Sequence, residues 1–169
     1  TGTQPREQLA DTVRAALETD TQHGAVVPPI HLTSTFAFSG YGEKREYDYS
    51  RSGNPTRDAL GRALADLEGG SGAVVTASGM GAVSLATQLF KPDQVAVVPH
   101  DCYGGTYRLF NALRERGSLA VRFVDFQDAA ALAGALEAEP ALVWVETPSN
   151  PLLRIVDIQL SFPAILVAL

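Results

Sequence analysis

Residues 95–145 read VAVVPHDCYGGTYRLFNALRERGSLAVRFVDFQDAAALAGALEAEPALVWV and alternate between two patterns. Short apolar runs at 95–98, 119–124 and 142–145 are typical of buried strands. Between them, residues 107–116 and 129–138 carry apolar side chains at helical spacing. Strands that alternate with helices of this length form βαβ units, so the sequence predicts an α/β fold with a mainly parallel sheet.

The alternation continues toward the N-terminus as far as Asn54. Asparagine followed by Pro55 is a favoured helix start and Gly69-Gly70 is a favoured helix end, so we expect a helix between them. A short apolar run at 73–76 predicts a further buried strand, and the spacing over 79–90 predicts another helix.

Residues 1–53 follow neither pattern. Residues 30–36 alternate loosely and allow a short strand, whereas 40–46 are polar and turn-rich and predict a surface loop. A long segment with so little periodicity usually packs on the rest of a larger chain or on another subunit. We therefore expect three parts: an N-terminal arm at 1–53, a partial α/β domain at 54–158 and an apolar tail at 159–169.

Composition excludes several classes of function. The 169 residues are 46% apolar and 19% charged, which predicts a packed core. No apolar run approaches the roughly 18 residues of a membrane span, and a net charge of −6 without a basic cluster argues against nucleic acid and anionic membranes as partners. Because Cys102 is the single cysteine and no signal-like core is seen, we expect a cytoplasmic protein.

The loop after the strand expected at 73–76 contains Gly79 and Gly81 at a helix start. Exposed backbone N–H groups there suit a phosphate, although a tight turn that needs glycine for packing explains the pattern equally well. The third glycine of a dinucleotide fingerprint is absent, since Ser84 stands there, and no P-loop lysine follows. The alternation of strands and helices would thus fit a nicotinamide-binding domain, but the glycine pattern does not.

Two further loops follow expected strands. Tyr103 precedes two glycines and is either a ring exposed for stacking on a planar ligand or a core tyrosine that anchors the loop. His100 and Cys102 lie beside it, but without a second cluster of ligands we do not expect a metal site. Asn150, between two prolines, is placed either to hold a ligand hydroxyl or to form a turn.

The arm contributes Tyr49 and Arg51, two residues apart in an extended segment, where their side chains point the same way. A guanidinium can grip phosphate through two hydrogen bonds. The alternative is a surface arginine next to a packed tyrosine.

Taken together, five motifs resemble the Cys/Met-metabolism family of pyridoxal-phosphate enzymes. They are YSRSGNPTR at 49–57, LEGG at 67–70, SGM at 78–80, HDCYGGTYRLF at 100–110 and ETPSNPLLR at 146–154. The resemblance runs from about Thr12 to Asp157 and is closest to the cystathionine γ-synthases. It implies the N-terminal part of a fold type I, aspartate aminotransferase-like transferase that uses pyridoxal 5′-phosphate.

The resemblance also implies roles for individual residues. Gly79 and Met80 would bind the cofactor phosphate through backbone N–H groups, Tyr103 would stack on the pyridine ring, and Asn150 would lie near the ring hydroxyl. Tyr49 and Arg51 would reach the phosphate of a neighbouring subunit's cofactor, which makes the arm an oligomer contact in a homotetramer built as a dimer of dimers. Arg108 would bind the distal carboxylate of O-succinylhomoserine, and Asp48 would help to place the incoming cysteine.

The implied reaction is γ-replacement on O-succinylhomoserine by L-cysteine, which gives L-cystathionine for methionine biosynthesis. Three alternatives stay open: cystathionine γ-lyase, homoserine-ester sulfhydrylase, and a non-catalytic remnant. Ser52 favours the lyases, because some synthases carry a second arginine at that position.

The sequence departs from the family in its lysines and its tail. The Schiff-base lysine of the family lies in a Ser-x-Thr-Lys-type motif, and neither Lys44 nor Lys91 matches it. We therefore expect a fragment that is inactive alone. Residues 159–169 end in an apolar run after Pro163, where the family continues into an amphipathic helix.

Overall fold

The computed structural model describes residues 14, 17, 20–156 and 165–167. The chain divides into two compact units, Thr1–Val75 and Thr76–Leu169, which we call unit 1 and unit 2. The expected boundary at residue 53 between the arm and the α/β domain stays a prediction. Asp157, the last residue of the family resemblance, and Pro163 of the tail lie outside the described residues.

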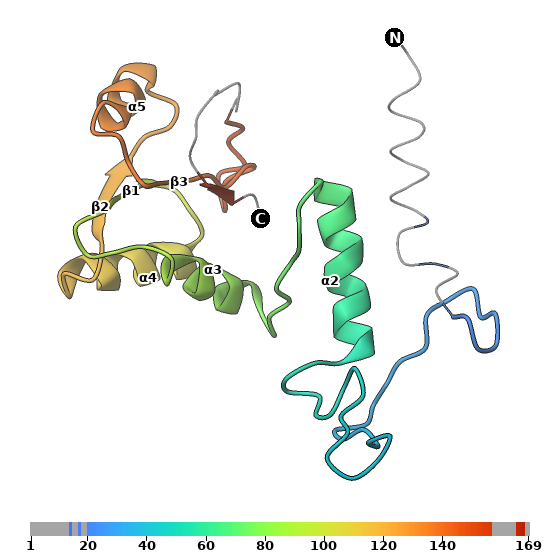
Figure 1. The fold of residues 1–169 in the computed structure, drawn as a ribbon. Helices are drawn as coiled ribbons and strands as arrows, with labels where there is room; N and C mark the ends of the chain where they lie inside the picture. Colours follow the sequence, from blue (N-terminus) through green and yellow to red (C-terminus); the bar gives the residue numbers. More distant parts are fainter. Residues whose placement is uncertain (1–13, 15–16, 18–19, 157–164, 168–169) are drawn as a thin grey trace. The chain divides into compact units, whose positions relative to one another are not determined.

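Unit 2 is an α/β layer with a parallel sheet, as predicted (Figure 1). The sheet order is β2-β1-β3-β4, and every pair is parallel. The strands are β1 (Val95–Pro99), β2 (Ala120–Val124), β3 (Leu142–Trp144) and β4 (Ile165–Val167). The last strand comes from the segment expected only as an apolar tail.

Three helices accompany this sheet: α3 (Gly79–Thr87), α4 (Gly104–Glu115) and α5 (Ala129–Leu136). α3 and α4 lie on one side of the strands and α5 on the other (Figure 1). Because both faces are covered, β1 and β3 are apolar throughout rather than alternating, whereas β2 at the sheet edge carries the exposed Arg122. The core joins Val83 of α3 and Phe110 of α4 to Val98 of β1 and Trp144 of β3.

The long helix among the described residues of unit 1 is α2 (Pro55–Glu68), whose ends are where the sequence predicts them. The Asn54 side chain accepts hydrogen bonds from the N–H groups of Thr56 and Arg57, and Gly69 ends the helix in the left-handed conformation. Over residues 20–54, strand-type pairing is limited to isolated bridges, of which Thr35 with Tyr49 is one.

The structure corrects three predicted elements. Residues 73–76 form no strand: the segment is extended, Val74 is 75% exposed, and no other described strand pairs with it. An apolar run becomes a strand only where a partner offers its backbone groups. Helix α3 ends at Thr87, three residues before the predicted end, and α4 begins at Gly104, three residues earlier than predicted.

Candidate functional site

A cavity of about 240 Å³ lies in unit 2 at the carboxyl ends of β1 and β3. Ligand sites of open parallel sheets concentrate at this edge. Its lining comes from the start of α3, the loop into α4, and the loop after β3. The lining residues are Gly79, Met80, Val83, Tyr103, Thr106, Glu146, Pro148 and Asn150.

The start of α3 provides hydrogen-bond donors to this cavity. The N–H groups of Gly79 and Met80 are the first two of the helix and have no carbonyl partner within it. Ser78 caps the helix by accepting from the Gly81 N–H at 3.1 Å. A Cβ on Gly81 would lie 3.4 Å from Ser78 Oγ, whereas one on Gly79 would meet nothing within 4 Å. Gly81 thus serves the tight turn, and Gly79 leaves open space in front of the donors.

The structure decides between the two interpretations of Tyr103. Its side chain is 48% exposed and lines the cavity, so it is not a core tyrosine. The ring lies close to the backbone of Gly105: a Cβ there would be 2.6 Å from Tyr103 Cε1 and 2.8 Å from Met80 Sδ. One flank of the ring is therefore packed, and the rest is available to a planar ligand.

Glu146 is a site residue to which the sequence analysis assigned no role. Its carboxylate is buried and accepts three hydrogen bonds, from the Tyr103 N–H at 2.6 Å, Thr106 Oγ1 at 2.7 Å and Trp144 Nε1 at 3.0 Å. The only hint in the sequence is a charged residue directly after the apolar run at 142–145. Two of its donors come from the start of α4 and the third from β3, so its role could not be read from that pattern.

Asn150 is exposed at the cavity, on a loop that is tied down on both sides. The Ser149 N–H donates to the Arg154 carbonyl, and Ser149 Oγ lies 3.0 Å from Asp101 Oδ2. The Arg154 guanidinium lies 3.7 Å from the same Asp101 carboxylate. These bonds fix the ends of the loop that carries Asn150, whose own amide makes none of them.

Cys102 and His100 do not contribute chemistry to the cavity. Burial, with the Glu146 charge as a smaller cause, raises the pKa of the Cys102 thiol to about 12, so the thiol stays protonated at neutral pH. His100 Nδ1 lies 3.3 Å from the Val124 carbonyl and 3.9 Å from the Asp125 carboxylate. Within the described part of the chain, no three His, Cys, Asp or Glu side chains gather as metal ligands.

The other expected site residues lie elsewhere. Arg108 is exposed on α4 and does not line the cavity. In unit 1, the Arg51 guanidinium lies 4.8 Å from the centre of the Tyr49 ring. The segment between them is not extended as predicted: it is a turn, in which the Ser52 and Gly53 N–H groups donate to the Tyr49 carbonyl, and this turn brings the two side chains together. The Asp48 carboxylate is 3.0 Å from Lys44 Nζ, which, with the Tyr49 N–H, lowers its pKa. Neither Lys44 nor Lys91 lines the unit 2 cavity.

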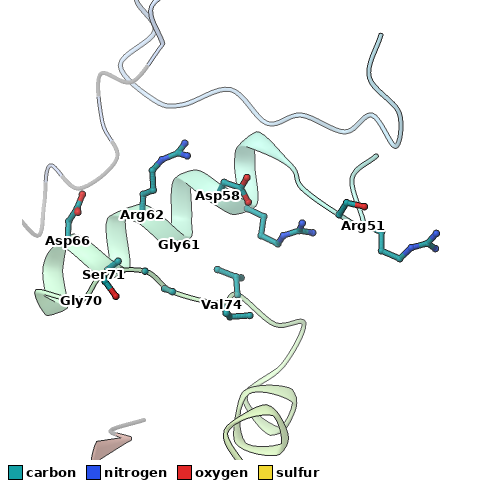
Figure 2. Close-up of a pocket in the computed structure, with 14 residues that line it drawn as sticks. Arg51, Asp58, Gly61, Arg62, Asp66, Gly70, Ser71 and Val74 are labelled. Atoms are coloured by element: carbon teal, nitrogen blue, oxygen red, sulfur yellow. The ribbon is translucent and has the colours of Figure 1, made fainter. Parts of the chain in front are cut away.

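Unit 1 has a larger cavity of its own, about 620 Å³, between α2 and the extended segment 70–75 (Figure 2). Arg51, Arg57 and Arg62 line it together with Asp58 and Asp66. Both signs of charge are therefore present at this cavity, with three arginines and two aspartates. It contains none of the groups that the unit 2 cavity presents to a planar ligand.

The groups of the unit 2 cavity fit pyridoxal 5′-phosphate. Free N–H groups at a helix start suit its phosphate, a half-exposed tyrosine ring suits its pyridine ring, and an amide suits its hydroxyl. Separately, no helix among the described residues is long and apolar enough to cross a membrane.

Comparisons with known proteins place the chain among enzymes that use this cofactor. The family described as Cys/Met metabolism PLP-dependent enzyme matches residues 10–164. Cystathionine gamma-synthase of Escherichia coli K12 is 58% identical over 154 residues, which cover 90% of this chain and 40% of that protein. Cystathionine beta-lyase of Coxiella burnetii is 44% identical over 147 residues, covering 86% and 38%.

A solved structure gives the same result. Cystathionine gamma synthase of Xanthomonas oryzae, in complex with aminoacrylate and cysteine, superposes with a TM-score of 0.80 and 55% identity, covering 89% of this chain and 39% of that one. The chain thus spans about 40% of the length of the curated relatives it matches. The matched family residues and the cavity at the sheet edge lead to one conclusion: this chain belongs to the Cys/Met-metabolism family of pyridoxal-phosphate-dependent enzymes.

Proposed function

We propose that the chain is the N-terminal portion of an enzyme that joins O-succinylhomoserine and L-cysteine into L-cystathionine by γ-replacement. The observation that carries this proposal is the meeting of Gly79, Met80, Tyr103 and Asn150 in one cavity of a chain that is 58% identical to a cystathionine γ-synthase. Such an enzyme would act in the cytoplasm, in methionine biosynthesis.

Each group of the cavity has a part in holding the cofactor. The Gly79 and Met80 N–H groups would bind the phosphate, where the positive end of the α3 dipole favours an anion. Tyr103 would stack on the ring, and Asn150 would donate to the ring hydroxyl. When bound, pyridoxal 5′-phosphate supplies an electron sink for the carbanion formed on the substrate.

The substrate would be recognised outside the cavity lining. Arg108 is exposed on α4 and would bind the distal carboxylate of the succinyl group. Asp48 keeps its negative charge to low pH and would orient the incoming cysteine through its ammonium group. The Schiff-base lysine would come from residues outside this chain, so the 169 residues alone would not catalyse the reaction.

The arm would complete a neighbouring subunit. Tyr49 and Arg51 already lie against each other and would reach the phosphate of a neighbour's cofactor. Unit 1 also exposes large apolar side chains such as Ile30 and Leu32, and their burial in a subunit contact would lower the free energy of assembly. We propose a homotetramer built as a dimer of dimers.

A hybrid enzyme tests the proposal. Residues 1–156 of this chain, fused to the remaining C-terminal part of Escherichia coli cystathionine γ-synthase, should bind the cofactor and form cystathionine from O-succinylhomoserine and cysteine. The expected rate is within about tenfold of the parent enzyme, and Arg51→Ala should reduce it at least tenfold. A folded hybrid that holds cofactor but forms no cystathionine would contradict the proposed reaction.

Cystathionine cleavage is the second candidate. Ser52 and the 44% identity to a cystathionine beta-lyase favour it. The hybrid incubated with cystathionine alone separates the two, because a lyase consumes it and a synthase does so only slowly. Formation of homocysteine from the ester and sulfide would instead indicate a sulfhydrylase, and a chain that binds no cofactor in any context would be a non-catalytic remnant.

A further inference from the structure

The position of the Tyr103 ring depends on the residue two places along the chain. Gly105 is buried in the first turn of α4, and the Tyr103 ring and the Met80 sulfur fill the space that a side chain there would take. A Cβ at 2.6 Å from the ring and 2.8 Å from the sulfur would overlap both atoms. The neighbouring Gly104 differs, because its Cβ would meet only the mobile end of Arg108 at 3.4 Å.

The main chain at Tyr103 is held from a different element. Tyr103 is the N-cap of α4 and makes no capping bond with its own side chain. The Glu146 carboxylate instead binds the N-cap residue itself: one oxygen accepts the Tyr103 N–H, and the other accepts from Thr106 Oγ1 and Trp144 Nε1. A carboxylate at this end is also favoured by the α4 dipole, which offsets the cost of burying its charge.

We propose that Glu146 and Gly105 are the positioning residues that set the Tyr103 ring for stacking on the cofactor. Glu146 fixes the backbone from which the ring projects, and Gly105 leaves the room in which the ring lies beside Met80. This inference rests on the proposed function, since it takes the occupant of the cavity to be pyridoxal 5′-phosphate. Neither residue would touch the reacting atoms.

The two adjacent glycines allow a matched test in the hybrid enzyme. Gly105→Ala should raise the dissociation constant for pyridoxal 5′-phosphate at least tenfold, because the ring must leave its place. The same change should leave the midpoint of thermal unfolding nearly unchanged, since alanine favours a helix over glycine, the half-exposed ring can turn into solvent, and the flexible Met80 side chain can shift away from the new methyl group. Gly104→Ala should leave the dissociation constant within twofold. Cofactor retention after dialysis, read by visible absorbance, gives these constants.

Glu146→Gln tests the other half of the proposal. An amide of the same shape turns one N–H₂ group toward the three donors, so at least one hydrogen bond is lost. In the 169-residue chain labelled with ¹⁵N-tyrosine, five amide signals are expected, and Tyr103→Phe identifies one of them. Glu146→Gln should speed hydrogen exchange at Tyr103 at least tenfold and leave the other four signals in place. Glu115→Gln, on the exposed side of α4, is the control.

The outcomes separate this inference from the proposed function. Looser cofactor binding in Gly105→Ala and faster hydrogen exchange of the Tyr103 amide in Glu146→Gln, with both controls unchanged, support it. If Gly105→Ala binds cofactor as tightly as the parent hybrid, the positioning role is wrong while the proposed function stands. The same holds if Glu146→Gln leaves the rate of hydrogen exchange at the Tyr103 amide unchanged. A parent hybrid that binds no cofactor would overturn both. Should Glu146→Gln fail to fold, Gly105→Ala alone decides, because it removes no buried hydrogen bond.

Discussion

Units 1 and 2 differ in how far their apolar side chains are buried. In unit 2, the apolar residues of β1 and β3 are almost fully buried beneath helices on both sides. In unit 1, α2 buries only Gly61 and Ala65, and Leu60, Leu64 and Leu67 remain exposed. Helical periodicity therefore predicts a helix in both places, but only unit 2 shows what the apolar face packs against.

The difference indicates two kinds of stability. Unit 2 has the large buried side chains whose transfer from water favours folding, whereas unit 1 is held by hydrogen bonds around Asn54. The apolar surface of unit 1 fits the proposal that the arm is completed by another polypeptide. Substitutions in matched pairs, one in each unit, test this contrast.

The largest contrast is expected between Trp144→Ala and Leu64→Ala. Trp144 is fully buried, and its ring centre lies 5.5 Å from that of Phe110, so its loss should lower the free energy of unfolding by about 3–5 kcal/mol. Leu64 is 44% exposed, and its loss should cost less than about 1 kcal/mol. Urea unfolding followed by far-ultraviolet circular dichroism measures both. A cost for Leu64→Ala near that of Trp144→Ala would mean that this face of unit 1 is covered in solution.

Thiol reactivity should differ next most strongly. Cys102 is buried and its pKa is raised from 9.0 to about 12, which reduces its thiolate fraction near pH 8 about a thousandfold. In Leu32→Cys, the new thiol replaces a side chain that is 91% exposed and should react with a disulfide reagent at an ordinary rate. The reaction should therefore show one fast and one very slow phase. Two phases of equal rate would contradict the burial of Cys102.

The same pKa shift predicts a pH dependence of stability. The unfolded thiol loses its proton above pH 9, while the folded one keeps its proton up to about pH 12. Between these values the unfolded state binds fewer protons, so the free energy of unfolding should fall as pH rises. Below pH 9 this group should contribute no slope. Cys102→Ala removes the contribution and serves as the control.

A smaller difference is expected between two helix caps. Asn54 caps α2 through its oxygen and also donates to the His31 carbonyl and to Ser50 Oγ, so it ties the helix to the arm. Asp128 caps α5 and bonds only to the N–H groups of Ala130 and Ala131. Asn54→Ala should cost about 1–2 kcal/mol and Asp128→Ala about 1 kcal/mol, as measured by hydrogen exchange in each helix. Equal costs would mean that the bonds to the arm add nothing.

The elements that sequence predicts best are those whose partners are also nearby in sequence. β1 and β2, joined by α4, are found within one residue of the predicted runs, because each run is rich in apolar β-branched and aromatic residues and is bounded by turns. The run at 73–76 has the same character, yet it forms no strand. An apolar run indicates that a segment can be buried. Whether it forms a strand depends on hydrogen bonds to a second strand, which the run itself does not identify.

The candidate site shows the same limit at the level of side chains. The glycines at 79 and 81 and the loop with Asn150 stand out in the sequence, since glycine and proline mark turns wherever they occur. Whether Tyr103 is exposed could not be decided, because the answer depends on Met80 from another helix. Glu146 was missed for a similar reason: its role comes from donors on β3 and α4 that meet only in the folded chain.

The smallest effect is expected at the ion pair of the arm. This pair tests whether charge contributes to the stability of unit 1 in addition to its hydrogen bonds. Lys44 and Asp48 are 3.0 Å apart but accessible to solvent, so Lys44→Ala should leave thermal unfolding unchanged. It should nevertheless raise the pKa of Asp48, because Lys44 is the main cause of its lowering. The Tyr49 N–H, at 2.7 Å, would still hold the Asp48 carboxylate and keep part of the shift. Nuclear magnetic resonance titration of Asp48 measures this. A pKa that does not move would show that the backbone bond alone lowers it, and a loss of unfolding temperature would show that unit 1 is held by its charges rather than by the contacts of Asn54.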